Sequence, residues 1–190
     1  MTKDYPLNAL GLSHKFMAEH ILPGDLCIDA TAGRGRDTLF LAKLVGGSGR
    51  VIAFDIQEEA IRSTESLLAE NGVENAEVHL VSHSDMDRFA EPGSVAGIMF
   101  NFGWLPGGDH TVFSRGDTSI EAIRKGLDLL RPGGVMTLCI YYGKETGYGE
   151  KEALTAYLKT VDPCRFTVVL CDFVNRVGEP PRLALIWKDN

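Results

Sequence analysis

Residues 29–37 hold the residue types and spacing best suited to bind a ligand in this chain. They read DATAGRGRD and follow an apolar run at residues 26–28. This order predicts a short buried strand, a glycine-bearing turn and then a helix over residues 39–44. Glycines without a Cβ let a ligand approach the backbone, and the first turn of a helix offers unpaired N–H groups. The stretch therefore predicts a site for a nucleotide-type ligand.

Two ligand classes fit such a turn. A dinucleotide site favours the spacing Gly-x-Gly-x-x-Gly, but after Gly33 and Gly35 the third position is Thr38. An acid, Asp29, also stands at the strand end before the glycines. This combination resembles the first motif of S-adenosylmethionine (SAM)-dependent methyltransferases, where acid and turn face the methionine part of the cofactor. We therefore expect SAM as the cofactor and keep a dinucleotide oxidoreductase as the alternative. The expected cofactor contacts in this stretch are Asp29, Thr31, Gly33, Gly35, Asp37 and Thr38.

Further cofactor contacts are predicted after the next two strands. Asp55 ends the apolar run 50–55, and a carboxylate at that point can accept both hydroxyls of a ribose. Gln57 follows closely and would border the adenosine. In methyltransferases of this plan the loop after the third strand borders the adenine, which makes His83, Ser84 and Asp85 candidates. An ordinary polar loop is the alternative interpretation of these residues.

The loop after the fourth strand is the second informative stretch. Residues 95–101 read VAGIMFN, and FGWLPGGD follows. Ligands of open parallel sheets bind beyond the strand C-termini where the strand order reverses, and the first and fourth strands flank that point. Asn101 would thus face the transferable methyl group, contact the cofactor, and accept a hydrogen bond from an attacking N–H through its amide oxygen. Trp104 or Phe102 could stack on a flat base. The expected substrate-binding residues here are Phe102, Trp104, Leu105, Pro106, Gly107 and Gly108.

The remaining patterns place these stretches in one fold. A helix is expected over residues 7–22, and its His14 and Lys15 either close over the ligand or lie on a solvated face. The last two strands are joined by residues 175–181, too few for a helical crossover, so they should be antiparallel. The expected strands are 26–30, 50–55, 76–81, 95–101, 135–142, 166–174 and 183–188.

These elements indicate an α/β fold. It is the Rossmann-like plan of class I SAM-dependent methyltransferases, with a seven-stranded, mostly parallel sheet, one antiparallel strand and helices on both faces. We expect a single domain over residues 1–190, made of an N-terminal helical segment 1–24 and a core 25–190.

Composition and charge exclude several classes of protein. The chain of 190 residues is 44% hydrophobic and 24% charged, which is ordinary for a globular domain. Its net charge of −7 argues against broad, sequence-independent coating of nucleic acid but leaves room for a local basic patch. The four cysteines form no Cys-x-x-Cys and the histidines show no ligand spacing, so no metal site is expected. The start lacks a signal-peptide core and no run nears about 18 apolar residues, so we expect a cytoplasmic protein without membrane contact.

Several motifs together resemble one family of small methyltransferases. They are DATAG-x-G-x-DT at residues 29–38, NFGWLPGGD at 101–109, YYG at 141–143 with Glu150, and Asn175 with PP at 180–181. The family has long been labelled "putative rRNA methylases", and its members are understood as tRNA 5-aminomethyl-2-thiouridine methyltransferases of Gram-positive bacteria and some plants. The resemblance covers nearly the whole chain. One departure is Lys144, where the family usually has His after Tyr-x-Gly.

The resemblance implies methyl transfer from SAM to the primary amine of 5-aminomethyl-(2-thio)uridine at the wobble position of tRNA. A neutral amine is already a competent nucleophile, so positioning can suffice. The amine must first lose a proton, and Asp29, Tyr142 or water could accept it. The implied catalytic residues are Asn101 and Tyr142, and Tyr142 and Lys144 join the substrate contacts. Aromatic residues beside Asn101 suit an unstacked anticodon base. Candidate phosphate contacts are Lys15, Arg34, Arg36, Arg115 and Lys144.

Other functions stay open at this point. A methyltransferase acting on rRNA or on a small-molecule amine fits an acidic chain without a separate RNA-binding domain. A non-catalytic SAM-binding module would share the glycine turn but would not need the Asn101 loop. The oligomeric state is also open, with a homodimer as one option.

Overall fold

The computed structural model describes residues 5–103, 116–142 and 144–189, and for residues 116 and 144–148 it describes the backbone alone. The strands are β1 (Leu26–Asp29), β2 (Arg50–Asp55), β3 (Ala76–Leu80), β4 (Val95–Phe102), β5 (Leu130–Ile140), β6 (Phe166–Cys171) and β7 (Arg182–Lys188). The helices are α1 (Ala9–His20), α2 (Arg36–Val45), α3 (Glu58–Glu70), the 3-10 helix η1 (His83–Arg88), α4 (Gly116–Leu129) and α5 (Lys144–Leu158).

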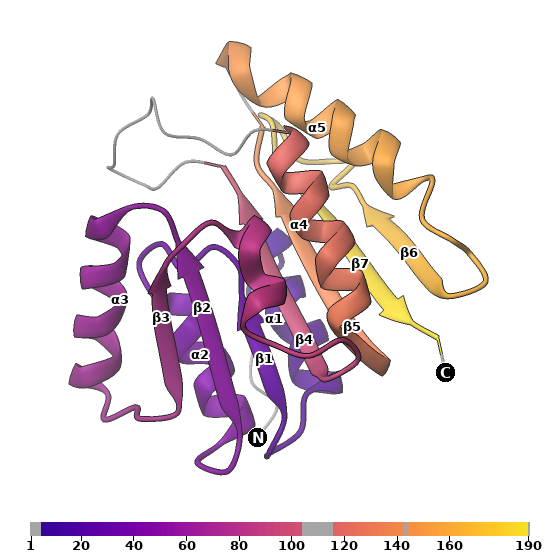
Figure 1. Ribbon diagram of the computed structural model, residues 1–190. Helices are drawn as coiled ribbons and strands as arrows, with labels where there is room; N and C mark the ends of the chain where they lie inside the picture. The colour runs from indigo at the N-terminus through magenta and orange to yellow at the C-terminus, as the bar shows by residue number, and fades with distance from the viewer. Residues whose placement is uncertain (1–4, 104–115, 143, 190) are drawn as a thin grey trace.

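All seven strands join one sheet in the order β3-β2-β1-β4-β5-β7-β6 (Figure 1). Neighbouring strands are parallel from β3 through β5, whereas β7 runs antiparallel to both β5 and β6. The predicted fold class and the antiparallel hairpin are therefore confirmed. Because β1 pairs with both β2 and β4, the strand order reverses on either side of it. That reversal is where open α/β sheets bind their ligands.

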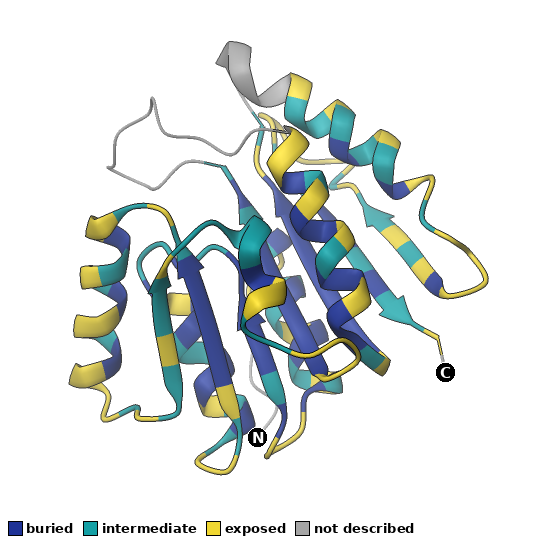
Figure 2. Ribbon diagram, viewed as in Figure 1, coloured by how far each residue is buried: buried dark blue, intermediate teal, exposed yellow. Residues whose placement is uncertain are grey.

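Helices cover both faces of the sheet. In Figure 1, α4, α5 and η1 lie on the near face, and α1 and α2 lie behind it. The near-face core includes Phe54, Ile98, Ile123 and Leu154, and the far-face core includes Met17. The central strands are buried on both sides (Figure 2), which explains why they read as continuous apolar runs instead of alternating patterns.

Two strand boundaries differ from those predicted by three residues or more. β5 begins at Leu130, five residues earlier than the sequence pattern indicates, because Leu130 pairs with Val95 before a bulge that resumes pairing at Gly97 and Val135. The Pro-Gly-Gly of this bulge interrupts the apolar run, so the sequence pattern does not show where the strand begins. β6 ends at Cys171, before the predicted end at residue 174.

The N-terminal helix α1 packs against the sheet behind β5 and β7, not at its edge. Its buried Ser13 donates a hydrogen bond to the hydroxyl of Thr137 on β5 at 2.8 Å. Asn8 caps the helix by accepting from the Gly11 N–H at 2.8 Å. The Ser13 contact fixes α1 against β5. Among the described residues, no helix is long and apolar enough to span a lipid bilayer.

Candidate functional site

The glycine turn after β1 is held by backbone hydrogen bonds to β2. The N–H of Ala32 donates to the carbonyl of Phe54 at 2.9 Å, and the N–H of Gly35 closes the turn on Ala32 at 2.8 Å. Gly35 has a φ of +77°, and a Cβ there would lie 2.8 Å from the Cα of Thr64 on α3. Position 35 therefore requires glycine both for its left-handed backbone and for the close approach of α3.

Asp29 anchors this turn from below. Its carboxylate accepts a hydrogen bond from the Thr31 N–H at 3.1 Å and another from the Thr38 hydroxyl at 2.6 Å. The side chain has no exposed surface. Burial, followed by the charge of Asp37 and more weakly that of Asp55, raises the pKa of Asp29 to about 7. The ionised form of Asp29 is therefore energetically unfavourable in the ligand-free chain, and a cationic ligand nearby would stabilise it.

Asp55 stands at the end of β2, as the sequence predicts. One carboxylate oxygen accepts from the Gly33 N–H at 2.9 Å, and the other accepts from the Gln57 N–H at 3.0 Å. A carboxylate offers about four acceptor positions, so two of them remain for the hydroxyls of a ribose. Asp55 is half-buried, and its bond to Gly33 fixes its carboxylate against the glycine turn.

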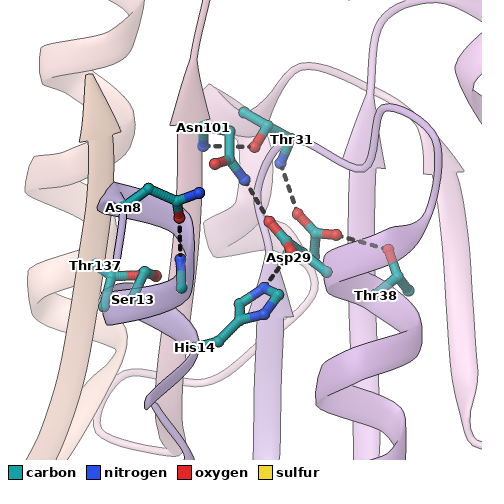
Figure 3. A network of polar contacts seen from close by, with 10 residues as sticks. Asn8, Ser13, His14, Asp29, Thr31, Thr38, Asn101 and Thr137 are labelled. Carbon is teal, nitrogen blue, oxygen red and sulfur yellow. Dashed lines mark hydrogen bonds and ion pairs between the residues drawn. The ribbon is translucent and has the colours of Figure 1, made fainter. Parts of the chain in front are cut away.

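Asn101 lies next to this turn, at the end of β4. Its backbone N–H donates to the hydroxyl of Thr31 at 2.8 Å, and its side-chain Nδ2 donates to Oδ2 of Asp37 at 2.5 Å (Figure 3). The β1 turn and the start of α2 therefore hold both the backbone and the side chain of Asn101.

His14 enters the site from α1. Its Nε2 lies 2.6 Å from Oδ1 of Asp37, and its ring stacks on Phe40 with centroids 4.0 Å apart and planes 10° from parallel. Of the two predictions for residues 14 and 15, the structure thus supports a place at the site for His14, whereas Lys15 is exposed and pairs with Glu19 at 4.0 Å. Nothing in the local pattern of α1 distinguished His14, because its partner lies 23 residues along the chain.

The loop expected beside the adenine folds as η1. Ser82 caps η1 through the Ser84 N–H, and Nζ of Lys125 on α4 donates to the Ser84 carbonyl at 2.6 Å. The His83 ring lies edge-on to Phe100 and Phe102 of β4. Burial lowers the pKa of His83, so its neutral form is favoured at this position. The loop therefore lies beside the end of β4.

Three of the residues predicted to contact a ligand have no exposed surface in the structure. Asp29 and Thr38 bond each other beneath the turn and shape it, and their direct contact with the cofactor stays a prediction. Phe102 was expected to stack on a base, but its ring stacks on Phe100 within the core at a centroid distance of 5.0 Å. The alternation of side chains along β4 explains this, because residues 98, 100 and 102 share the inward face toward α4.

The acceptor side of the site is only partly described. Nζ of Lys151 lies 3.4 Å from the ring centroid of Tyr142, which stands two residues beyond the end of β5. The side chain of Lys144 and the residues Trp104, Leu105, Pro106, Gly107 and Gly108 lie outside what the structure describes. Within the described part of the chain, no group of three or more potential metal ligands occurs.

The residues at this edge fit SAM by their chemistry. The ligand carries positive charge at its sulfonium and its ammonium, and the carboxylates of Asp29, Asp37 and Asp55 gather at the carboxyl ends of β1 and β2. The charges of Asp37 and Asp55 both raise the pKa of Asp29, because each disfavours the ionised form of that carboxyl. A cation bound above them would offset this effect.

Comparisons with known proteins point in the same direction. Residues 51–187 match the family model described as "Putative rRNA methylase". The "tRNA (mnm(5)s(2)U34)-methyltransferase, chloroplastic" of Arabidopsis thaliana is 37% identical over 193 residues, which cover 96% of this chain and 70% of that protein. A "putative rRNA-methylase" structure from Clostridium thermocellum is 42% identical, with a TM-score of 0.94 over 96% of this chain and 98% of the other. A "putative methyltransferase" from Streptococcus mutans, in complex with SAH, is 33% identical, with a TM-score of 0.88 over 96% and 99% of the two chains.

Proposed function

The chain belongs to the "Putative rRNA methylase" family and is a SAM-dependent methyltransferase, and from this premise we propose that its acceptor is a tRNA wobble uridine. Specifically, the methyl group goes to the primary amine of 5-aminomethyl-(2-thio)uridine. The name of the Arabidopsis thaliana relative, a tRNA (mnm(5)s(2)U34)-methyltransferase, supports this choice of substrate.

The observation that carries the proposal is the placement of Asn101 beside the glycine turn. Its backbone is fixed by Thr31 and its amide nitrogen by Asp37, so its amide oxygen is directed away from Asp37. An amide oxygen accepts hydrogen bonds, and an amine N–H is the donor that an aminomethyl group supplies. A hydrogen bond between them would aim the nitrogen lone pair at the methyl group.

SAM supplies a methyl group bound to a sulfonium, which neutral amines attack directly. The described residues perform binding and orientation around it. The turn at residues 30–35 and Asp55 hold the cofactor side, with Gln57, His83 and Ser84 beside the adenosine. Asn101, in β4, and Tyr142, two residues beyond the end of the adjacent strand β5, line the acceptor side.

The incoming ammonium must release one proton before it can attack. Asp29 is an unsuitable acceptor because it is fully enclosed and already accepts two hydrogen bonds. Tyr142 or water therefore stays as the proposed proton acceptor.

Two of the basic residues proposed for phosphate contact already pair with acids. Nη1 of Arg34 lies 2.9 Å from Glu59, and Lys15 pairs with Glu19. Arg36, in the first turn of α2, is exposed. With a net charge of −7, the chain would depend on a few local contacts, so its RNA affinity should vary weakly with salt.

The proposal is tested by incubating the chain and SAM with tRNA that carries the aminomethyl precursor and with matched tRNA that lacks it. Nucleosides from both are then analysed by mass spectrometry. Methylation of the precursor tRNA alone would support the proposal. Methylation of both tRNAs, or of rRNA or free amines in preference, would refute it in favour of another acceptor.

A further inference from the structure

Asp37 joins two side chains that the sequence gives no reason to connect. It lies in the first turn of α2 and is 6% exposed. Oδ1 of Asp37 lies 2.6 Å from Nε2 of His14, and Oδ2 lies 2.5 Å from Nδ2 of Asn101. The three residues come from α1, α2 and β4, so tertiary packing alone brings them together.

This arrangement decides which way the Asn101 amide faces. An amide has one end that donates and one end that accepts, whereas an ionised carboxylate only accepts. The Asp37 carboxylate therefore requires the Asn101 nitrogen on its own side. The amide oxygen must then point to the opposite side, and the bond from the Asn101 backbone to Thr31 keeps the residue from moving as a whole.

His14 restrains the carboxylate itself. With its Nε2 protonated, the imidazole donates to Oδ1 of Asp37, and stacking on Phe40 fixes the plane of the ring. An aspartate held at one oxygen cannot rotate freely about its carboxyl group. The second oxygen is thereby fixed opposite Asn101.

We propose that Asp37, braced by His14, is a positioning residue that presents the amide oxygen of Asn101 to the acceptor amine. This inference rests on the proposed function for the identity of the amine. It replaces the expectation that Asp37 contacts the cofactor. Asp37 acts through Asn101, so its loss should affect turnover and leave cofactor affinity nearly intact.

Two variants test this role: one replaces the Asp37 carboxylate with an amide, and the other exchanges the carboxylate and the amide between positions 37 and 101. In Asp37→Asn, an amide faces the Asn101 amide. Because an amide can both donate and accept, position 37 no longer requires the Asn101 nitrogen on its side, and the Asn101 oxygen is no longer held toward the substrate. We expect kcat to fall about 100-fold, because misplacing a group that aims the reacting atoms costs about that much. In the double variant Asp37→Asn with Asn101→Asp, a carboxylate and an amide again face each other with their positions reversed. Its free carboxylate oxygen accepts the amine N–H, so it should regain roughly tenfold in kcat over Asp37→Asn.

The control is Asp128→Asn, the same chemical change at an exposed aspartate near the end of α4. It should leave kcat unaltered. Binding of S-adenosylhomocysteine, measured by calorimetry, should change by less than about threefold in Asp37→Asn. A loss of that affinity as large as the loss of kcat would overturn the proposal and return Asp37 to the cofactor site. A double variant no better than the single one, with both folded by thermal melt, would also overturn it.

A second readout needs no substrate. The Asn101 side-chain N–H that points at Asp37 makes a charge-assisted hydrogen bond, which should shift its proton resonance downfield. The signal is assigned by its loss in Asn101→Asp, and it should move back in Asp37→Asn. If the signal stays in place, the Asp37–Asn101 contact is wrong. If the signal moves but the wild-type chain does not methylate aminomethyl tRNA, the positioning role of Asp37 is supported and the proposed substrate is refuted.

Discussion

The buried carboxylate beneath the glycine turn predicts an unusual pH dependence of stability. Burial and the neighbouring charge of Asp37 raise the pKa of Asp29 from 3.8 to about 7 in the folded chain. Since the folded-state pKa lies above the unfolded one, the folded chain holds this proton more tightly between those two pH values. The stabilisation from this proton is complete below about pH 4 and is lost as the pH rises through about 7.

The size of the effect follows from the two pKa values. One pKa unit corresponds to about 1.4 kcal/mol, so the ligand-free chain loses about 4 kcal/mol of unfolding free energy from Asp29 across this range. Asp29→Asn mimics the protonated form and keeps an acceptor for the Thr31 N–H. The stability gap between variant and wild type should therefore widen by about 3 kcal/mol between pH 5 and pH 8.

The assay is thermal unfolding of both ligand-free proteins at pH 5 and pH 8. For a chain of this length 1 kcal/mol shifts Tm by roughly 2–4 °C, so the Tm of Asp29→Asn should gain roughly 6–12 °C on wild type between the two pH values. SAM should bind the variant more weakly, since the charge beneath the turn attracts the cationic ligand. Asp128→Asn is the control and should show no pH-dependent gap. If the Tm difference between Asp29→Asn and wild type is the same at pH 5 and pH 8, the raised pKa of Asp29 is refuted.

Three further outcomes are expected at the same site. Asp55→Ala should weaken SAM binding by calorimetry because the ribose hydroxyls lose their acceptor, and unchanged affinity would refute that placement. Asn101→Ala should lose turnover more than cofactor affinity, whereas equal losses would assign Asn101 to the cofactor or the fold. Gly35→Ala should cost about 1–3 kcal/mol of stability through its φ of +77° and its contact with Thr64, while Gly47→Ala, with nothing within 4 Å of the added Cβ, should cost little.

The sequence predicts most of the fold because local patterns of residues mark most of its strands, turns and helices. The turn at residues 29–37 and the acid at Asp55 are each identified by a strand end followed by a helix start, which needs no knowledge of distant residues. The start of β5 was missed because a bulge containing Pro-Gly-Gly interrupts the apolar run. A bulge depends on the neighbouring strand, and the β5 segment alone does not reveal it.

The side-chain network of the site could not be predicted in the same way. The contact of Asp37 with Asn101 spans 64 residues, and its contact with His14 spans 23. The first depends on the register of β1 with β4, and the second depends on how α1 packs behind the sheet. The direction of the Phe102 side chain was also missed, because an apolar strand buried on both faces does not show which face each residue occupies.

We propose above that the methyl group goes to the side-chain amine of a tRNA wobble uridine. The most direct test is a reaction with SAM carrying a deuterated methyl group, followed by digestion of the tRNA and fragmentation of the labelled nucleoside. The account predicts that the label is found on the amine of the 5-aminomethyl group and that it is nearly absent with Asn101→Ala. A label on the base ring or on the ribose, or on any nucleoside of tRNA without the aminomethyl group, would contradict it.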